Sequence, residues 1–248
     1  MVVVAGGAGG IGTATSLRMA DEGASVVVGD LNADAARDVA ARINANGGHA
    51  VGVPVDISDE ESVSALVRTA LTEFGGIDAL HANAADLSPA TLAGDTDVVS
   101  IDMDTFDHVL SVNLRGHVLC TRHAVPALLE RGGGALVYTA SDAAFVGEPQ
   151  RVGYAIAKAG IGALVRHVAS RWGKDRIRAN AVAPGVVVTP TIAETSADHG
   201  LGRYLAHARS WRLGEPADIA AMVAHLMSDD GQWINGQVIS VNGGMVLR

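Results

Sequence analysis

Residues 1–12 read MVVVAGGAGGIG. The first five residues form a short run rich in β-branched side chains, and the glycines lead directly into a helical pattern over Ile11 to Glu22. A strand, a glycine-rich turn and a helix in this order let the backbone approach a pyrophosphate, whose charge the free N–H groups of the helix stabilise. Two glycine registers fit the stretch, Gly7-x-Gly9-x-x-Gly12 and Gly6-x-x-x-Gly10-x-Gly12.

The next predicted strand, Ser25 to Gly29, ends in Asp30. Asp30 follows the last glycine of the turn at about the distance from which a carboxylate reaches the adenosine ribose of a dinucleotide. The alternative is that Asp30 only caps the turn after its strand. A carboxylate there would repel a 2′-phosphate, and neither Leu31 nor Ala8 supplies a cation to offset the repulsion. We therefore expect NAD, not NADP, as the dinucleotide.

The same alternation of strands and helices continues along the chain. We expect strands at His49–Val55, Ile77–Ala82 and Ala135–Ala140, and helices at Ala33–Ala45, Ser58–Phe74 and Met103–Arg131, the second opened by a capping box over Ser58 to Glu61. Repeated units of this kind predict an α/β fold, a Rossmann-type doubly wound parallel sheet of about seven strands with helices on both faces. We expect one domain over residues 1–248, with ligands at the carboxyl ends of its strands.

Composition excludes several other classes of protein. The chain of 248 residues has 48% hydrophobic residues and a formal charge of -9, which disfavours binding to nucleic acid or to an anionic membrane. No apolar stretch reaches the length of a membrane span. The single Cys120 cannot form an internal disulfide, so a cytoplasmic location is expected, and the nine histidines are not spaced as a metal site.

The segment Arg151 to Val165 is the main candidate for chemistry. A helix brings positions four apart onto one face, so the phenol of Tyr154 and the ammonium of Lys158 are expected to point the same way. A nearby cation lowers the pKa of a phenol from about 10 toward the range useful to a general acid or base. The alternative is an exposed helix with two neighbouring polar residues. A serine hydrolase is excluded, because Ser141 lacks the Gly-x-Ser-x-Gly elbow.

These motifs together resemble the short-chain dehydrogenase/reductase family, in its compact single-domain branch. The residues that carry the resemblance are Gly6-x-x-x-Gly10-Ile-Gly12, Asn83-Ala84, Ser141, Tyr154-x-x-x-Lys158 and Pro184-Gly185. The resemblance covers almost the whole chain, and the separation of Ser141 from Tyr154 also matches the family. It implies the glycine register that begins at Gly6.

The resemblance also implies roles for individual residues. Tyr154 would be the catalytic acid/base, Lys158 would lower its pKa and hold the nicotinamide ribose, Ser141 would orient the substrate oxygen, and Asn113 would support a proton relay through water. The implied cofactor-binding residues are Gly6, Gly10, Ile11, Gly12, Asp30, Leu31, Asp56, Ile57, Asn83, Ala84, Tyr154, Lys158, Pro184, Gly185, Val187 and Thr189. Among them, Asp56 matches the position that contacts adenine, whereas Val187 and Thr189 match those that hold the carboxamide.

Four positions depart from the family pattern. Ala5 stands where the family often has Thr, and Ala82-Asn83-Ala84-Ala85 replaces Asn-Asn-Ala-Gly, so two side-chain contacts beneath the cofactor are expected to be missing. Asn242 stands where Asp is common. None of these residues bears the chemistry, so the expected reaction type is unaffected.

Two segments and one helix face suggest partners. Residues 190–212 are expected to form a substrate lid, and residues 86–104 a possible wall of the active-site mouth. Small residues on the Tyr154 helix imply, through the resemblance, a subunit interface in a homotetramer or homodimer. We expect an oxidoreductase that transfers a hydride between NAD and a secondary alcohol or ketone. An NADPH-dependent 3-oxoacyl reductase and a non-catalytic nucleotide-binding protein on the same fold remain alternatives.

Overall fold

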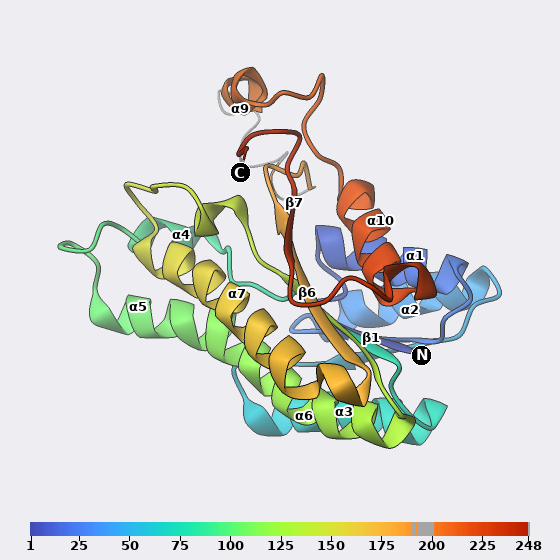
Figure 1. The fold of residues 1–248 in the computed structure, drawn as a ribbon. Coiled ribbons are helices and arrows are strands. Elements are labelled where there is room, and N and C mark those ends of the chain that lie inside the picture. Colours follow the sequence, from blue (N-terminus) through green and yellow to red (C-terminus); the bar gives the residue numbers. More distant parts are fainter. Residues whose placement is uncertain (190–191, 193–200, 248) are drawn as a thin grey trace.

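The computed structural model describes residues 1–189, 192 and 201–247, and its centre is a parallel sheet of seven strands (Figure 1). The strands lie in the order β3-β2-β1-β4-β5-β6-β7, and every neighbouring pair is parallel. The strands are β1 (Val2–Ala5), β2 (Val26–Asp30), β3 (Ala50–Pro54), β4 (Ala79–Ala82), β5 (Gly134–Thr139), β6 (Ile177–Pro184) and β7 (Val238–Val241). The expected Rossmann-type sheet is confirmed.

Helices cover both faces of this sheet. They are α1 (Gly10–Asp21), α2 (Ala33–Ala45), α3 (Glu60–Phe74), α4 (Pro89–Gly94), α5 (Met103–Leu110), α6 (Gly116–Arg131), α7 (Val152–Trp172), α9 (Leu201–His207) and α10 (Pro216–Met227). Figure 1 shows α3, α5, α6 and α7 on one side of the strands and α1, α2 and α10 on the other. Each side has its own apolar core, so strands such as β1 are buried along their whole length.

The strand order creates a crevice at one end of the sheet. The chain leaves β1 toward β2 and β3 on one side and later continues from β4 to β7 on the other. Connections that diverge in this way leave space beyond the carboxyl ends of the strands, between β1 and β4. Ala5, the last residue of β1, pairs with Ala82, the last residue of β4. The residues that follow these two strands therefore line one crevice.

Local structure differs from expectation in two places. The side chain that caps α3 is Asp59, which accepts a hydrogen bond from the amide of Glu61, whereas the hydroxyl of Ser58 turns back to Asp56. The predicted capping box at Ser58 is therefore wrong. The expected long helix from Met103 to Arg131 is continuous in direction but contains a π-helical turn over Ser111–Arg115.

The two segments expected near the mouth differ in how much of them the structure describes. Residues 86–104 include α4, whose N-cap is Ser88. Of the predicted lid, residues 190–191 and 193–200 lie outside the described residues, and the later part contains the exposed helix α9. Among the helices within residues 1–189 and 201–247, none is long and apolar enough to cross a bilayer.

Candidate functional site

The glycine turn between β1 and α1 leaves no room for side chains at its key positions. Gly6 has a φ of 80°, in the left-handed region, and a Cβ atom there would lie 2.5 Å from the Cα of Ala84. A Cβ atom on Gly12 would collide with the carbonyl oxygen of Gly6. Helix α1 begins after Gly9 with no side-chain cap and no acidic residue in its first turn. Among the described residues, no side chain therefore competes for its first N–H groups at the crevice.

The turn is supported from below by the end of β4. The carbonyl oxygen of Ala5 accepts hydrogen bonds of 2.9 Å from the amides of Asn83 and Ala84. The side-chain amide of Asn83 donates to the carbonyl of Gly6, also at 2.9 Å. The departures at Ala5 and residues 82–85 predicted that two side-chain contacts beneath the cofactor are missing. The hydrogen bond from Asn83 to Gly6 is one side-chain contact that is present there.

Asp30 lies beside the same turn and makes two hydrogen bonds. Its Oδ2 accepts from the backbone amide of Ala8 at 2.9 Å, and its Oδ1 accepts from that of Asn32 at 3.1 Å. The carboxylate therefore caps the turn after its strand, and its role toward the ribose stays a prediction. Each carboxylate oxygen has a second lone pair, so these bonds leave acceptor capacity for a ribose hydroxyl. The adjacent Leu31 is exposed.

The remaining predicted cofactor residues fall into two groups around this crevice. Asp56 is exposed and holds the amide and hydroxyl of Ser58, whereas the side chain of Ile57 is buried against Gly116. On the other side, the segment after Pro184-Gly185 passes over the start of α1. A Cβ atom on Gly10 would lie 2.5 Å from the Cγ2 of Thr189. The structure therefore brings Thr189 to the glycine turn.

Ser141, Tyr154 and Lys158 meet at the carboxyl end of β5. Ser141 follows β5, and its hydroxyl forms a hydrogen bond with the phenol of Tyr154. Lys158 is 1% exposed, and its ammonium donates to the carbonyl oxygen of Thr139 at 2.8 Å. The Lys158 Nζ lies 5.6 Å from the centroid of the Tyr154 ring. The two side chains therefore share a helix face, as their spacing predicted.

The electrostatics of this group differ from the expectation. Burial raises the pKa of the Tyr154 phenol, although the hydrogen bond with Ser141 and the charge of Arg151 act to lower it. Burial also lowers the pKa of Lys158 to about 7. The expected lowering of the phenol pKa is therefore not seen in this structure, because removal of the phenol from water outweighs the groups that lower its pKa.

Asn113 lies in the π-helical turn and is fully buried. Neither its amide oxygen nor its amide nitrogen has a hydrogen-bond partner among the described residues. A buried polar group of this kind is normally paired with protein or with an ordered water. A π-helical turn often marks a functional position, because its extra residue changes which side chain faces inward.

Two polar groups next to the site were missed by the sequence analysis. Asp95 is 2% exposed, and its carboxylate binds the backbone at the start of α7. None of residues 149–152 has a side chain that commonly caps a helix, and this feature of the sequence could have indicated that α7 needs a partner from elsewhere in the chain.

His81 donates to the hydroxyl of Thr139, which in turn donates to Asn83. Burial lowers the pKa of His81 to about 3, so the ring is neutral.

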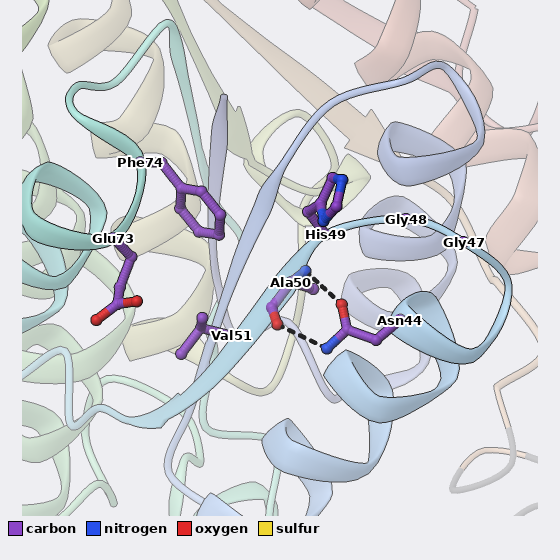
Figure 2. Close-up of a pocket in the computed structure, with 8 residues that line it drawn as sticks. All are labelled: Asn44, Gly47, Gly48, His49, Ala50, Val51, Glu73 and Phe74. Atoms are coloured by element: carbon purple, nitrogen blue, oxygen red, sulfur yellow. Dashed lines mark hydrogen bonds between the residues drawn. The ribbon is translucent and has the colours of Figure 1, made fainter.

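A separate hollow lies at the opposite end of the sheet. Figure 2 shows its lining, which consists of Asn44, Gly47, Gly48, His49, Ala50, Val51, Glu73 and Phe74. Asn44 closes one side through hydrogen bonds to the amide and carbonyl of Ala50, at the start of β3. Since all strands are parallel, this hollow is a sheet length away from Ser141 and Tyr154.

The fold and the site together define an α/β protein with a nucleotide-type glycine turn and a half-buried tyrosine beside a buried lysine. Residues 6–246 match the family model described as enoyl-(acyl carrier protein) reductase. A probable short-chain type dehydrogenase/reductase of Bradyrhizobium diazoefficiens is 39% identical over 100% of this chain and 88% of its own. The chain therefore belongs to the short-chain dehydrogenase/reductase family, and it is an oxidoreductase by that membership.

Two further relatives carry more specific names. The cis-4-hydroxycyclohexanecarboxylate dehydrogenase of Sinomonas cyclohexanicum is 37% identical, over 98% of this chain and 95% of its own. A solved structure of a 7 alpha-hydroxysteroid dehydrogenase, complexed with NADH and 7-oxo glycochenodeoxycholic acid, superposes with a TM-score of 0.91 at 32% identity. That comparison covers 100% of this chain and 94% of the other.

Proposed function

We propose that the protein catalyses reversible hydride transfer between NAD and a secondary alcohol or ketone. The observation that carries this proposal is the meeting of Ser141, Tyr154 and Lys158 at the carboxyl end of β5, beside the crevice formed by the glycine turn. Related chains named as dehydrogenases of a hydroxysteroid and of a hydroxycyclohexanecarboxylate support an alcohol substrate.

The residues around the crevice fit a nicotinamide dinucleotide. A pyrophosphate would occupy the space that the glycine turn leaves free, where the first N–H groups of α1 have no side-chain cap. Asp30 and Leu31 would take the adenosine end, with Asp56 near the adenine, and Val187 and Thr189 the carboxamide end. Neither Ala8 nor Leu31, the neighbours of Asp30, supplies a cation to accept a 2′-phosphate, which supports NAD. When bound, the nicotinamide supplies the hydride chemistry and, when oxidised, a positive charge.

The protein residues supply proton transfer. In the oxidation direction, the phenolate oxygen of Tyr154 accepts the hydroxyl proton of the alcohol, while the hydroxyl of Ser141 donates a hydrogen bond to the same substrate oxygen. In reduction the phenol returns that proton. The protonated form of Lys158 favours the phenolate, because its charge lies on the same helix face. Asn113 is buried, and its amide has no partner within the part of the chain that the structure describes, so it would hold a water that connects Lys158 with solvent.

Small residues on α7, among them Ala155 and Ala159, support the proposal of a subunit interface in a homotetramer or homodimer. The exposed Ile156 between them supplies apolar area for such a contact. We also propose that the enzyme is cytoplasmic and that its substrate is a small molecule.

A second candidate is an NADPH-dependent 3-oxoacyl reductase, since the description of the matching family model also names a reductase of an acyl carrier protein substrate. Asp30 argues against NADPH, and the acidic residues of segment 86–104 argue against a phosphate-bearing acyl carrier. Titration of both coenzymes with a panel of alcohols, ketones and a 3-oxoacyl thioester distinguishes the two. A preference for NADPH would favour the second candidate.

The proposed chemistry is tested by Tyr154→Phe, which removes the phenolic oxygen and keeps the ring. We expect turnover of any alcohol found in the panel to fall by at least about 10³-fold. NADH binding, followed by nucleotide fluorescence, should change little. Turnover that survives this substitution would remove Tyr154 as the acid/base, and loss of NADH binding as well would point to a disturbed fold.

A further inference from the structure

The helix that carries Tyr154 begins without a cap of its own. The residue before its first turn, Arg151, has a φ of 63° and makes no side-chain capping bond, and the first turn of α7 contains no acidic residue. The first four N–H groups of a helix have no partner inside it, and an uncapped first turn frays. Tyr154 lies within this first turn, so its position depends on whatever pairs with these groups.

Two consecutive residues from a distant loop supply every one of these partners. The carbonyl oxygen of Asp95 accepts from the amide of Arg151 at 2.8 Å, and that of Thr96 accepts from Val152 at 3.2 Å. The carboxylate of Asp95 then accepts from the next two amides, Oδ1 from Gly153 and Oδ2 from Tyr154, each at 2.8 Å. One buried carboxylate thus holds the backbone of Tyr154 directly.

The close approach depends on a glycine in the helix. A Cβ atom at Gly153 would lie 3.2 Å from the Oδ1 of Asp95 and 3.1 Å from the Cγ1 of Val109 on α5. Both distances are tighter than ordinary contacts. The carboxylate therefore sits against the helix with almost no free space, which fixes the first turn against α5 as well as against the loop.

From these contacts we propose that Asp95 is a positioning residue, whose carboxylate holds the first turn of α7 so that the phenol of Tyr154 meets the hydroxyl of Ser141. This inference rests on the proposed function, since it concerns the same proton-transfer group. Ser141 belongs to the end of β5 and Tyr154 to α7, so their hydrogen bond requires two elements to keep their relative position. A misplacement of about 1 Å in an active site lowers turnover by on the order of 10²-fold.

Asp95 could instead serve the stability of the fold alone, as a helix cap does. A cap is worth about 1 kcal/mol of stability and its loss leaves the chemistry of the remaining folded molecules unchanged. The two roles are separated by the ionisation of Tyr154, because the hydrogen bond from Ser141 lowers the pKa of its phenol. A displaced phenol loses that bond and ionises at a higher pH.

The test compares Asp95→Asn with Gly153→Ala. Asn has one acceptor oxygen and places an NH₂ group against a backbone amide, so one of the two bonds is lost. Gly153→Ala keeps the carboxylate and its charge but pushes it from the helix. The matched control is Asp59→Asn, which removes the negative charge of the aspartate at the start of α3 and keeps an oxygen that accepts from the amide of Glu61.

The readouts are kcat at saturating coenzyme across pH, and ultraviolet titration of the phenolate, with the spectrum of Tyr154→Phe subtracted. We expect Asp95→Asn and Gly153→Ala to lower kcat at least about tenfold and to move the ionisation of Tyr154 to higher pH. Asp59→Asn should keep the kcat and the Tyr154 ionisation of the wild type. If Asp95→Asn does not fold, the kcat and the phenolate titration of Gly153→Ala still distinguish a positioning role of Asp95 from a purely stabilising one.

Three results would overturn the inference. The first is an unchanged phenolate titration in both variants. The second is a shift to lower pH in Asp95→Asn only, which is the effect of removing a negative charge without moving the phenol. The third is a loss of kcat matched by Asp59→Asn. The wild type could oxidise no alcohol while both variants still move the ionisation of Tyr154 to higher pH. In that case the proposed function fails and the positioning role of Asp95 stands.

Discussion

The side-chain amide of Asn242 donates a hydrogen bond of 3.1 Å to the carboxylate of Asp142. Asn242 directly follows β7, and Asp142 directly follows Ser141, so this bond joins the last strand to the turn that carries the candidate substrate-orienting hydroxyl. A second bond from the same amide reaches the carbonyl of Val246. Asn242, which stands where the family commonly has Asp, therefore places a hydrogen-bond donor next to the carboxylate of Asp142.

Replacing this donor by a second carboxylate should destabilise the fold. In Asn242→Asp two like charges would face each other, which raises a carboxyl pKa in the folded state. The stability loss is then present at neutral pH and relieved as the pH falls toward about 4 to 5, because the folded state takes up the extra proton. We expect a loss of about 1–3 kcal/mol at pH 7, measured by urea unfolding at several pH values.

Asn242→Ala serves as the control for that experiment, because it removes the donor and adds no charge. Its deficit relative to the wild type should vary less with pH than that of Asn242→Asp. Equal deficits for the two variants at pH 5 and pH 7 would mean that charge repulsion at Asp142 is absent.

The buried ammonium of Lys158 makes stability depend on pH in the alkaline range. Its pKa in the folded state is about 7, below the ordinary value for a lysine, so between about pH 7 and pH 10 the unfolded chain binds more protons than the folded one. Stability should therefore rise with pH across this window, by up to about 1.4 kcal/mol per pH unit from this residue.

Lys158→Met keeps the length of the side chain and removes the titrating group. We expect thermal unfolding of this variant to lose most of the rise between pH 7 and pH 9. Lys174, the other lysine, is exposed, and Lys174→Met should retain the dependence of the wild type. A wild-type protein whose melting temperature is flat over this range would contradict the lowered pKa.

The glycine turn offers a comparison between two neighbouring positions. Gly12→Ala places a methyl group on the carbonyl oxygen of Gly6, a backbone atom that cannot move away without opening the turn. At Gly9 the nearest atom to an added methyl is 3.9 Å away, and its φ of -71° suits alanine. We expect Gly12→Ala to lower the melting temperature by several degrees and to weaken NADH binding, whereas Gly9→Ala should keep the wild-type melting temperature.

Binding should be measured for both variants by nucleotide fluorescence. Because Gly9 precedes the first turn of α1, its methyl group can weaken NADH binding without loss of stability. A Gly12→Ala protein as stable as the wild type would show that the turn relaxes easily, and the fit of the turn to a pyrophosphate would lose its geometric support.

Periodic and short-range features were predictable from the sequence. The strand, turn and helix order of residues 1–30 gave the sheet, because hydrophobic runs and glycines act locally. Tyr154 and Lys158 were placed on one face by helical spacing alone. The approach of Asn83 to Gly6 follows from the same topology, since both lie at the carboxyl ends of neighbouring strands.

Long-range polar contacts and burial were not predictable. Asp95 and Tyr154 are far apart in sequence, and nothing near Asp95 distinguishes it from the other aspartates of its loop. The expected lowering of the phenol pKa failed because sequence spacing gives the distance between two groups but not how much water surrounds them. Ser58 and Asp59 are both good caps, and packing of the incoming chain decides between them.

The π-helical turn at Ser111–Arg115 has a consequence for the length of the chain as well as its composition. Such a turn holds one residue more than the helix on either side of it would need. Deleting a residue that flanks Asn113 in this turn would restore a regular helix, which keeps the side chains beyond the turn on their faces but changes which residue of the turn points inward. Asn113 would then leave the interior even though no functional residue had been replaced, so this part of the enzyme is specified by how many residues it has.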